Sequence, residues 1–198
     1  MGSSAMGTIC FGLSGEGRGH ATRAQVLIEA LKEQHRLVVC TYGDAWEMLS
    51  RIYARSDVEI RRLPGLRFRY DREGRLDHTA TALFAAPYLA RLPERVLLWS
   101  RELERAGADL VISDFEPLLP RAARQAGVPH RSVDHQHFLV AYDLSSLRPE
   151  LRLRAELLAQ AGAAVLLGSE AHDRFGLLLS VAQGSAGGGH ARWRSLAA

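Results

Sequence analysis

Short apolar runs alternate with longer segments of helical periodicity along most of the chain. The runs are rich in valine, isoleucine and leucine and end at glycine, proline or polar residues, as buried strands do. They lie at 7–14, 36–42, 58–63, 109–113, 131–134 and 163–168. Parallel strands need a crossover, usually a helix, between one strand and the next. The alternation therefore predicts an α/β fold with a doubly wound, mostly parallel sheet.

Helices are expected at 20–34, 44–54, 79–106, 114–126 and 149–161. The third of these contains Pro87 and Pro93, which predict either two helices or one kinked helix. The segment 64–78 has no sustained period and is interpreted as an excursion from the sheet, with a hairpin turn at Glu73-Gly74.

Residues 1–175 are interpreted as a single Rossmann-like domain. The remainder, 176–198, is dominated by glycine, serine and alanine with scattered arginine and has little apolar periodicity. This composition predicts a flexible tail, or an aberrant one that follows a truncation or frameshift.

Charge and cysteine content narrow the class of protein. The net charge is +3, from 25 Lys and Arg against 22 Asp and Glu. This balance favours anionic partners only weakly, and no nucleic-acid-binding module accompanies it, so nucleic acid is not an expected partner. The apolar runs are too short to cross a bilayer and no secretory signal precedes them, which predicts a cytoplasmic protein. Cys10 and Cys40 lie in expected strands and are interpreted as buried, reduced thiols.

Three alternating glycines, Gly15, Gly17 and Gly19, separate the first expected strand from the first expected helix. Glycine permits a positive φ and leaves the backbone open to a ligand, while the N-terminus of the following helix offers N–H groups to an anion. The loop therefore predicts a site for a phosphate, a carboxylate or a sugar hydroxyl. A tight turn whose glycines serve only packing is the alternative.

Two common nucleotide-binding motifs fit this loop incompletely. The dinucleotide fingerprint that starts at Gly15 requires a small residue where His20 stands, although Asp44 after the second strand could bind a ribose. The P-loop motif fails because Arg18-Gly19 occupies the place of its Lys and Ser/Thr. Hydrolysis of nucleoside triphosphates is accordingly not expected.

The loop and two later segments resemble a family of GT-B-fold glycosyltransferases, the group-1/family-28-like enzymes, whose first loop reads G-x-G-x-G-H-x-x-R. The residues that carry the resemblance are Gly15, Gly17, Gly19, His20, Arg23, 113–117 (SDFEP) and 134–137 (DHQH). The resemblance covers about residues 8–175. It implies the N-terminal, acceptor-side half of an enzyme that transfers a hexosyl group from a nucleotide-diphosphate sugar to an acceptor hydroxyl, often on a glycolipid or cell-wall precursor.

The resemblance also implies no catalytic metal and no cofactor. Members of the family continue into a second, donor-binding domain, whereas the pattern in this sequence is lost after Phe175. Independent catalysis by the isolated half is therefore left open.

His20 is the expected catalytic base, since imidazole exchanges a proton near neutral pH. Asp114, after the fourth strand, is expected to face the same cleft and to orient either His20 or an acceptor hydroxyl. The alternatives are a helix-capping histidine and an aspartate that caps the helix after it. Arg18 and Arg23 are expected to contact a diphosphate or an anionic acceptor, with ordinary solvated arginines as the alternative.

Three further residues are expected to bind substrate. Glu116 is a weaker candidate for the pocket of Asp114. His135 and His137 follow the fifth strand in a polar loop that is interpreted as acceptor-binding. A structural loop is the alternative there, and a metal site is disfavoured because no second set of ligands lies nearby in the sequence.

The excursion carries arginines among apolar and aromatic residues, namely Arg61, Arg62, Arg67, Arg69, Arg72 and Arg75 with Leu66, Phe68 and Tyr70. Such a patch suits anionic lipid headgroups that carry an acceptor, which gives an expectation of peripheral association with the inner face of a membrane. A solvated, charged hairpin is the alternative.

Two rival functions are kept at this point. One is a dinucleotide-binding oxidoreductase or epimerase that uses Asp44 on a ribose. The other is a non-catalytic half that pairs with a partner chain carrying the donor site.

Overall fold

The computed structural model of the chain describes residues 6–133, 148, 149 and 151. Strands and helices alternate within them as the periodicity predicts. In chain order they are β1 (Thr8–Leu13), α1 (Arg18–Leu31), β2 (Arg36–Thr41), α2 (Gly43–Ile52), β3 (Glu59–Arg62), α3 (His78–Ala90), α4 (Leu92–Ala106), β4 (Ala108–Asp114), α5 (Leu118–Ala126) and β5 (His130–Ser132).

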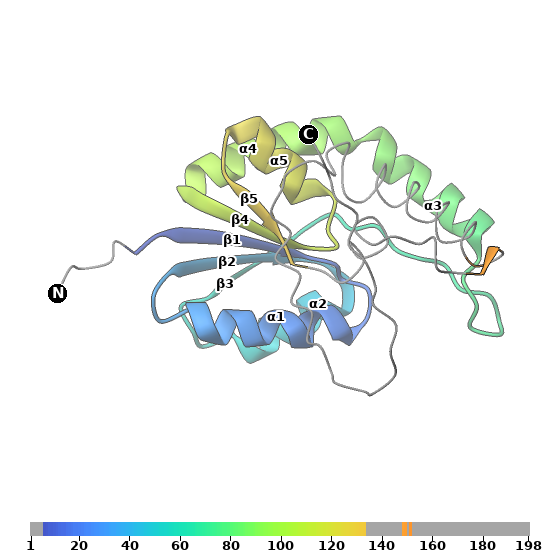
Figure 1. Cartoon of the computed structure of the whole chain (residues 1–198), viewed down its shortest axis with the longest axis horizontal. Coiled ribbons are helices and arrows are strands. Elements are labelled where there is room, and N and C mark those ends of the chain that lie inside the picture. The colour runs from blue at the N-terminus through green and yellow to red at the C-terminus, as the bar shows by residue number, and fades with distance from the viewer. Residues whose placement is uncertain (1–5, 134–147, 150, 152–198) are drawn as a thin grey trace.

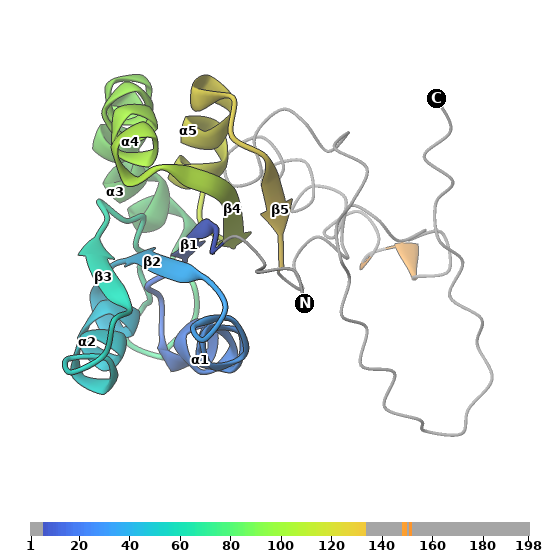
Figure 2. The ribbon, with the colours of Figure 1, turned by 90° about the vertical axis from the view of Figure 1, so that its left-hand side faces the viewer.

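The five strands form one parallel sheet in the order β3-β2-β1-β4-β5 (Figure 2). Helices α1 and α2 cover one face, and α3, α4 and α5 lie over the other (Figure 1). Along β1, Ile9, Phe11 and Leu13 belong to the core beneath α1 and α2, whereas Cys10 belongs to the opposite core. Because both faces of the sheet are covered, the strands read as continuous apolar runs. The doubly wound, Rossmann-like fold is thus confirmed.

The long helical segment is divided at Arg91 into α3 and α4. Pro87 lies inside α3, and Pro93 lies in the first turn of α4, where a missing N–H is tolerated. Residues 64–77 form the excursion, and its hairpin is closed by the antiparallel bridge between Tyr70 and Leu76. The helix expected at 149–161, the strand expected at 163–168 and the tail expected at 176–198 lie largely or wholly outside the described residues.

The alternative interpretation, in which Asp114 caps the following helix, was wrong. Asp114 is the last residue of β4, and α5 begins four residues later, at Leu118. The two carboxylate oxygens of Glu116 instead accept the N–H groups of Leu118 and Leu119, each at 2.8 Å. These are two of the N–H groups that a helix start leaves without a partner, so Glu116 stabilises α5 and leaves Asp114 for other contacts.

Burial raises the pKa of Glu116 from 4.5 to about 7, although both N–H groups favour its charged form. The folded state therefore binds this proton more tightly than the unfolded state. Its contribution to stability is complete below about pH 4.5 and is lost as the pH rises through about 7.

We expect this residue to lower the free energy of unfolding by about 3 kcal/mol across that pH range. Urea unfolding at a series of pH values measures the change. Glu116→Gln should remove this part of the pH dependence, at a cost of about 1 kcal/mol in acid for a weakened helix start. Glu47→Gln, at an exposed position in α2, is the control. Parallel pH profiles for the wild type and Glu116→Gln would contradict the prediction.

Candidate active site

The carboxyl ends of β1 and β4 form the switch point of the sheet. Leu13 and Asp114 are register partners at these ends, and the Ser14 N–H donates to the Asp114 carbonyl at 2.9 Å. From here the chain leaves toward α1 on one face and toward α5 on the other (Figure 1). Open parallel sheets bind ligands at such a point, which is where the glycine loop and Asp114 were expected.

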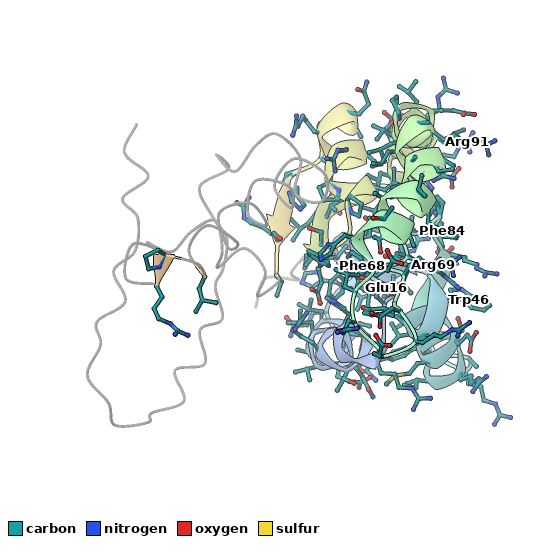
Figure 3. The ribbon with its side chains drawn as sticks, turned by 90° about the vertical axis from the view of Figure 1, so that its right-hand side faces the viewer. Glu16, Trp46, Phe68, Arg69, Phe84 and Arg91 are labelled. Atoms are coloured by element: carbon teal, nitrogen blue, oxygen red, sulfur yellow. The ribbon has the colours of Figure 1, made fainter. Side chains whose placement is uncertain are left out.

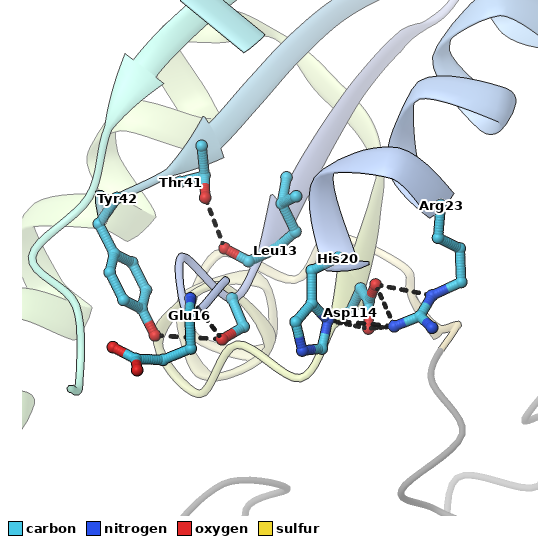
Figure 4. A network of polar contacts seen from close by, with 8 residues as sticks. Leu13, Glu16, His20, Arg23, Thr41, Tyr42 and Asp114 are labelled. Atoms are coloured by element: carbon cyan, nitrogen blue, oxygen red, sulfur yellow. Dashed lines mark hydrogen bonds and ion pairs between the residues drawn. The ribbon is translucent and has the colours of Figure 1, made fainter. Parts of the chain in front are cut away.

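His20, Arg23 and Asp114 meet at this edge (Figure 4). The Nδ1 atom of His20 lies 3.0 Å from Oδ1 of Asp114. Nε of Arg23 donates to Oδ2 of Asp114 at 3.0 Å, and Nη2 of Arg23 lies 2.8 Å from both carboxylate oxygens. The Asp114 side chain is only 1% exposed, whereas that of His20 is 12% exposed and that of Arg23 is 35% exposed. Two residues from one turn of α1 therefore converge on a buried carboxylate.

Two groups contact Nδ1 of His20 and favour opposite tautomers. An ionised carboxylate only accepts hydrogen bonds, so the contact with Asp114 favours a proton on Nδ1 and a lone pair on Nε2. A guanidinium only donates, and Nη2 of Arg23 lies 3.0 Å from the same Nδ1 atom, which favours the reverse. The ring of Phe115 stacks on the imidazole, with 6.0 Å between centroids and an angle of 5° between planes. Phe115 holds a positive φ of 53°, an uncommon backbone conformation for a bulky residue. This local strain lies directly beside the His20 ring.

The three loop glycines have different structural roles. A Cβ on Gly15 would lie 2.1 Å from the Tyr42 carbonyl oxygen, so the glycine is needed for close packing. Gly17 precedes α1 with a φ of 69°, which favours glycine. A Cβ on Gly19 would meet nothing within 4 Å, and the first turn of α1 has neither an acidic residue nor a side-chain cap. The exposed side of this turn, with Arg18, is therefore open to an anion.

Glu16 was quoted only as part of the loop motif, and no role was predicted for it. Its carboxylate accepts the backbone N–H of Phe68, and burial raises its pKa. Close by, the hydroxyl of Tyr42 donates to the Leu66 carbonyl at 2.9 Å, and burial raises the pKa of Tyr42 to about 12. These contacts hold the 64–77 excursion against the glycine loop. No sequence signal identifies them, because the excursion has no periodicity from which its path could be read.

The remaining candidate residues are not brought together with His20 in the same way. Glu116 is 2% exposed and is occupied by the start of α5, so its substrate-binding role stays a prediction. Asp44 lies exposed in the first turn of α2, and its N–H donates to the Gly15 carbonyl at 3.2 Å. His135 and His137 lie outside the described residues.

The described part of the chain has neither a metal-binding cluster nor a membrane-spanning helix. No group of three or more His, Cys, Asp or Glu side chains there could hold a metal ion. Nor is any helix in that part long and apolar enough to span a bilayer.

Gly15→Ala and Gly19→Ala are expected to show that Gly15 is required for packing, whereas Gly19 lies in open space. Gly15→Ala should lower the free energy of unfolding by about 2–4 kcal/mol, because a backbone carbonyl must move to admit the methyl group. Gly19→Ala should leave stability unchanged or raise it by up to about 1 kcal/mol, because alanine is the better helix former. Urea unfolding of the two variants measures both effects. Equal losses would show that Gly19 is also a packing residue.

A comparison with family models matches residues 7–166 to a family described as glycosyl transferase family 1. Two solved structures illustrate the more distant similarities. The zinc-inhibited form of teicoplanin deacetylase Orf2 is 14% identical over 82% of this chain and 87% of its own, with a TM-score of 0.40. Formyltetrahydrofolate deformylase from Burkholderia mallei is 14% identical over 84% of this chain and 66% of its own, with a TM-score of 0.33. Similarity at this level carries no conclusion about chemistry.

A comparison with curated proteins gave no significant match. The family match covers β1 to β5 and includes the glycine loop, His20 and Asp114. It agrees with the resemblance that the loop sequence suggested. The chain therefore belongs to glycosyl transferase family 1.

Proposed function

We propose that this domain is the acceptor side of a glycosyltransferase that moves a hexosyl group from a nucleotide-diphosphate sugar to an acceptor hydroxyl. The observation that carries the proposal is the 3.0 Å contact between Nδ1 of His20 and the buried carboxylate of Asp114. A general base must present a lone pair to the proton it removes. In the proposed tautomer Nδ1–H donates to Asp114, and Nη2 of Arg23 bonds the carboxylate rather than the imidazole. The lone pair then lies on Nε2 of His20, at the edge of the sheet where ligands bind.

In the proposed reaction, Nε2 of His20 takes the proton of the acceptor hydroxyl. The acceptor oxygen attacks C1 of the donor sugar, and the bond between C1 and the diphosphate oxygen breaks, so the nucleoside diphosphate leaves with the electron pair. Attack from the opposite side inverts the configuration at C1. Asp114 acts as a positioning residue, since it holds the imidazole in the required tautomer and stabilises the imidazolium that forms.

Negative charge that develops on the departing diphosphate needs a positive partner. The uncapped start of α1 and the exposed Arg18 supply one beside His20. Arg23 is already bonded to Asp114, so its proposed role is to compensate the buried charge rather than to bind the diphosphate. A donor-binding half, on the same protein or on a partner chain, completes the site in this proposal, as the family resemblance implies.

His20→Ala and Asp114→Asn test the proposed roles. The full chain is incubated with nucleoside-diphosphate hexoses and a panel of hydroxyl acceptors, and hexosylated product is measured by mass spectrometry. We expect both variants to lower the rate by about 10²–10⁴-fold, the usual contribution of a general base. Glu33→Gln, at an exposed position in the turn that follows α1, should leave the rate unchanged.

Nitrogen NMR of His20 provides a readout that does not require turnover. The wild type should show Nδ1 protonated and Nε2 free, and Asp114→Asn should shift the population toward the other tautomer. A histidine with Nε2 protonated in the wild type would contradict the proposed base. Calorimetry with NAD in parallel tests the dinucleotide alternative, because tight NAD binding would favour that rival.

A further inference from the structure

Helix α3 is unusual because it is apolar on all sides and yet mostly exposed. Its sequence, HTATALFAAPYLA, contains no Asp, Glu, Lys or Arg. Only Ala85 and Tyr88 are buried, whereas Leu83 is 72% exposed and Phe84 is 46% exposed. A helix that is apolar all round is normally buried. Because Leu83 and Phe84 are exposed, no segment in the described part of the chain covers the outer face of α3.

The hairpin of the excursion is attached to this helix and extends the same surface. The guanidinium of Arg69 lies 3.9 Å from the ring centroid of Phe84, and the Arg69 N–H donates to Oγ1 of Thr81 at 2.9 Å. Tyr70 and Leu76, which close the hairpin, are 59% and 38% exposed. The combined surface of α3 and the hairpin is called the apolar lip below.

The hairpin of the apolar lip carries net positive charge. The hairpin carboxylates of Asp71 and Glu73 are both bonded to Arg75. Arg69 and Arg72, in contrast, are exposed and make no salt bridge among the described residues. Among the charges of the hairpin that make no salt bridge within the described part of the chain, Arg67, Arg69 and Arg72 outnumber Asp77, so the charge left without an ionic partner is net positive. Arginines alternate with aromatic rings in the segment that runs from Arg67 to Tyr70.

The apolar lip lies close to the candidate active site. Helix α3 and the hairpin extend past the carboxyl ends of the strands (Figure 1). Figure 3 looks onto this edge and shows Phe84 and Arg69 next to Phe68 and Glu16. The contact of Arg69 with Phe84 and the hydrogen bond from the Phe68 N–H to Glu16 join the apolar lip to the glycine loop.

We infer that the apolar lip docks on an anionic lipid bilayer. Leucine and phenylalanine side chains enter the boundary between headgroups and acyl chains, while arginines and tyrosine stay at the headgroups. A bilayer fits better than an acidic protein, because the exposed side chains of α3 from Ala82 to Ala90 have no hydrogen-bonding groups, whereas the cations lie on the neighbouring hairpin. Docking in this way would bring a lipid-linked acceptor to the edge that holds His20, and this last step rests on the proposed function.

Vesicle co-sedimentation of the full chain tests the inference. We expect binding to vesicles of phosphatidylcholine mixed with phosphatidylglycerol, weaker binding to phosphatidylcholine alone, and a decrease with added salt. Leu83→Asp should abolish binding. The matched control is Val26→Asp, at a 68% exposed position on α1 in the opposite helical layer, and it should bind like the wild type. Arg69→Gln and Arg72→Gln should each weaken binding about fivefold.

A second reporter detects insertion directly. The fluorescence of Leu83→Trp should shift to the blue with anionic vesicles, whereas Val26→Trp should show no such shift. Absence of vesicle binding, or equal binding by Leu83→Asp and the wild type, would overturn the inference. A dimer in sedimentation equilibrium that Leu83→Asp dissociates would instead assign the apolar lip to a second copy of the chain. Transfer to a water-soluble acceptor tests His20 separately, so the two proposals can fail independently.

Discussion

The buried carboxylate of Asp114 is the constraint on which the architecture of this edge depends. A charge that is 1% exposed is costly unless it is paired and hydrogen-bonded. Arg23 and His20 supply these partners from one turn of α1, while the carboxylate comes from the end of β4. One cluster therefore fixes the start of α1 on the switch point and, at the same time, holds the imidazole of the proposed base. Stability and the proposed chemistry depend on the same contacts.

Tyr42 has the corresponding role for the loops around that edge. Its backbone lies so close to Gly15, and its ring so close to Gly65, that a Cβ on either glycine would overlap it at 2.1 Å. The Tyr42 side chain is buried, and its hydroxyl donates to the Leu66 carbonyl, so the ring is held in one position. The glycine loop and the excursion are thus packed on one aromatic side chain. The position of Glu16, and through it that of Phe68, follows from this packing.

Two kinds of surface meet at the carboxyl edge. The site of His20 is polar, and its geometry depends on hydrogen bonds at 3.0 Å or less. The apolar lip on α3 carries exposed Leu83 and Phe84, and its proposed interaction depends on area and charge rather than on fixed geometry. A polar site next to an apolar lip suits an acceptor with a hydroxyl at one end and an apolar body at the other.

Local sequence determined most of the sheet. Strands β1 to β5 follow from apolar runs, and the break between α3 and α4 follows from the prolines, because periodicity and backbone restriction act over a few residues. The glycine loop and His20 were predicted from a local motif of alternating glycines. The carboxylate that caps α5 was not predicted. Asp114 and Glu116 are both acidic, and the path of the chain after β4, with a positive φ at Phe115 and a helix start at Leu118, places Glu116 at the cap.

The tertiary structure decided between the contacts that the sequence left open. Asp114 was expected to orient either His20 or an acceptor hydroxyl, and no contact with Arg23 was expected. Its pairing with His20 and Arg23 joins residues 94 and 91 positions apart, and it exists because β1 and β4 are neighbours in the sheet. Glu16 meets Phe68 because Tyr42 holds the excursion in place. Sequence thus determined the elements and the loop chemistry, whereas the strand order and the packing of aperiodic segments determined the site, because both depend on contacts that no local pattern encodes.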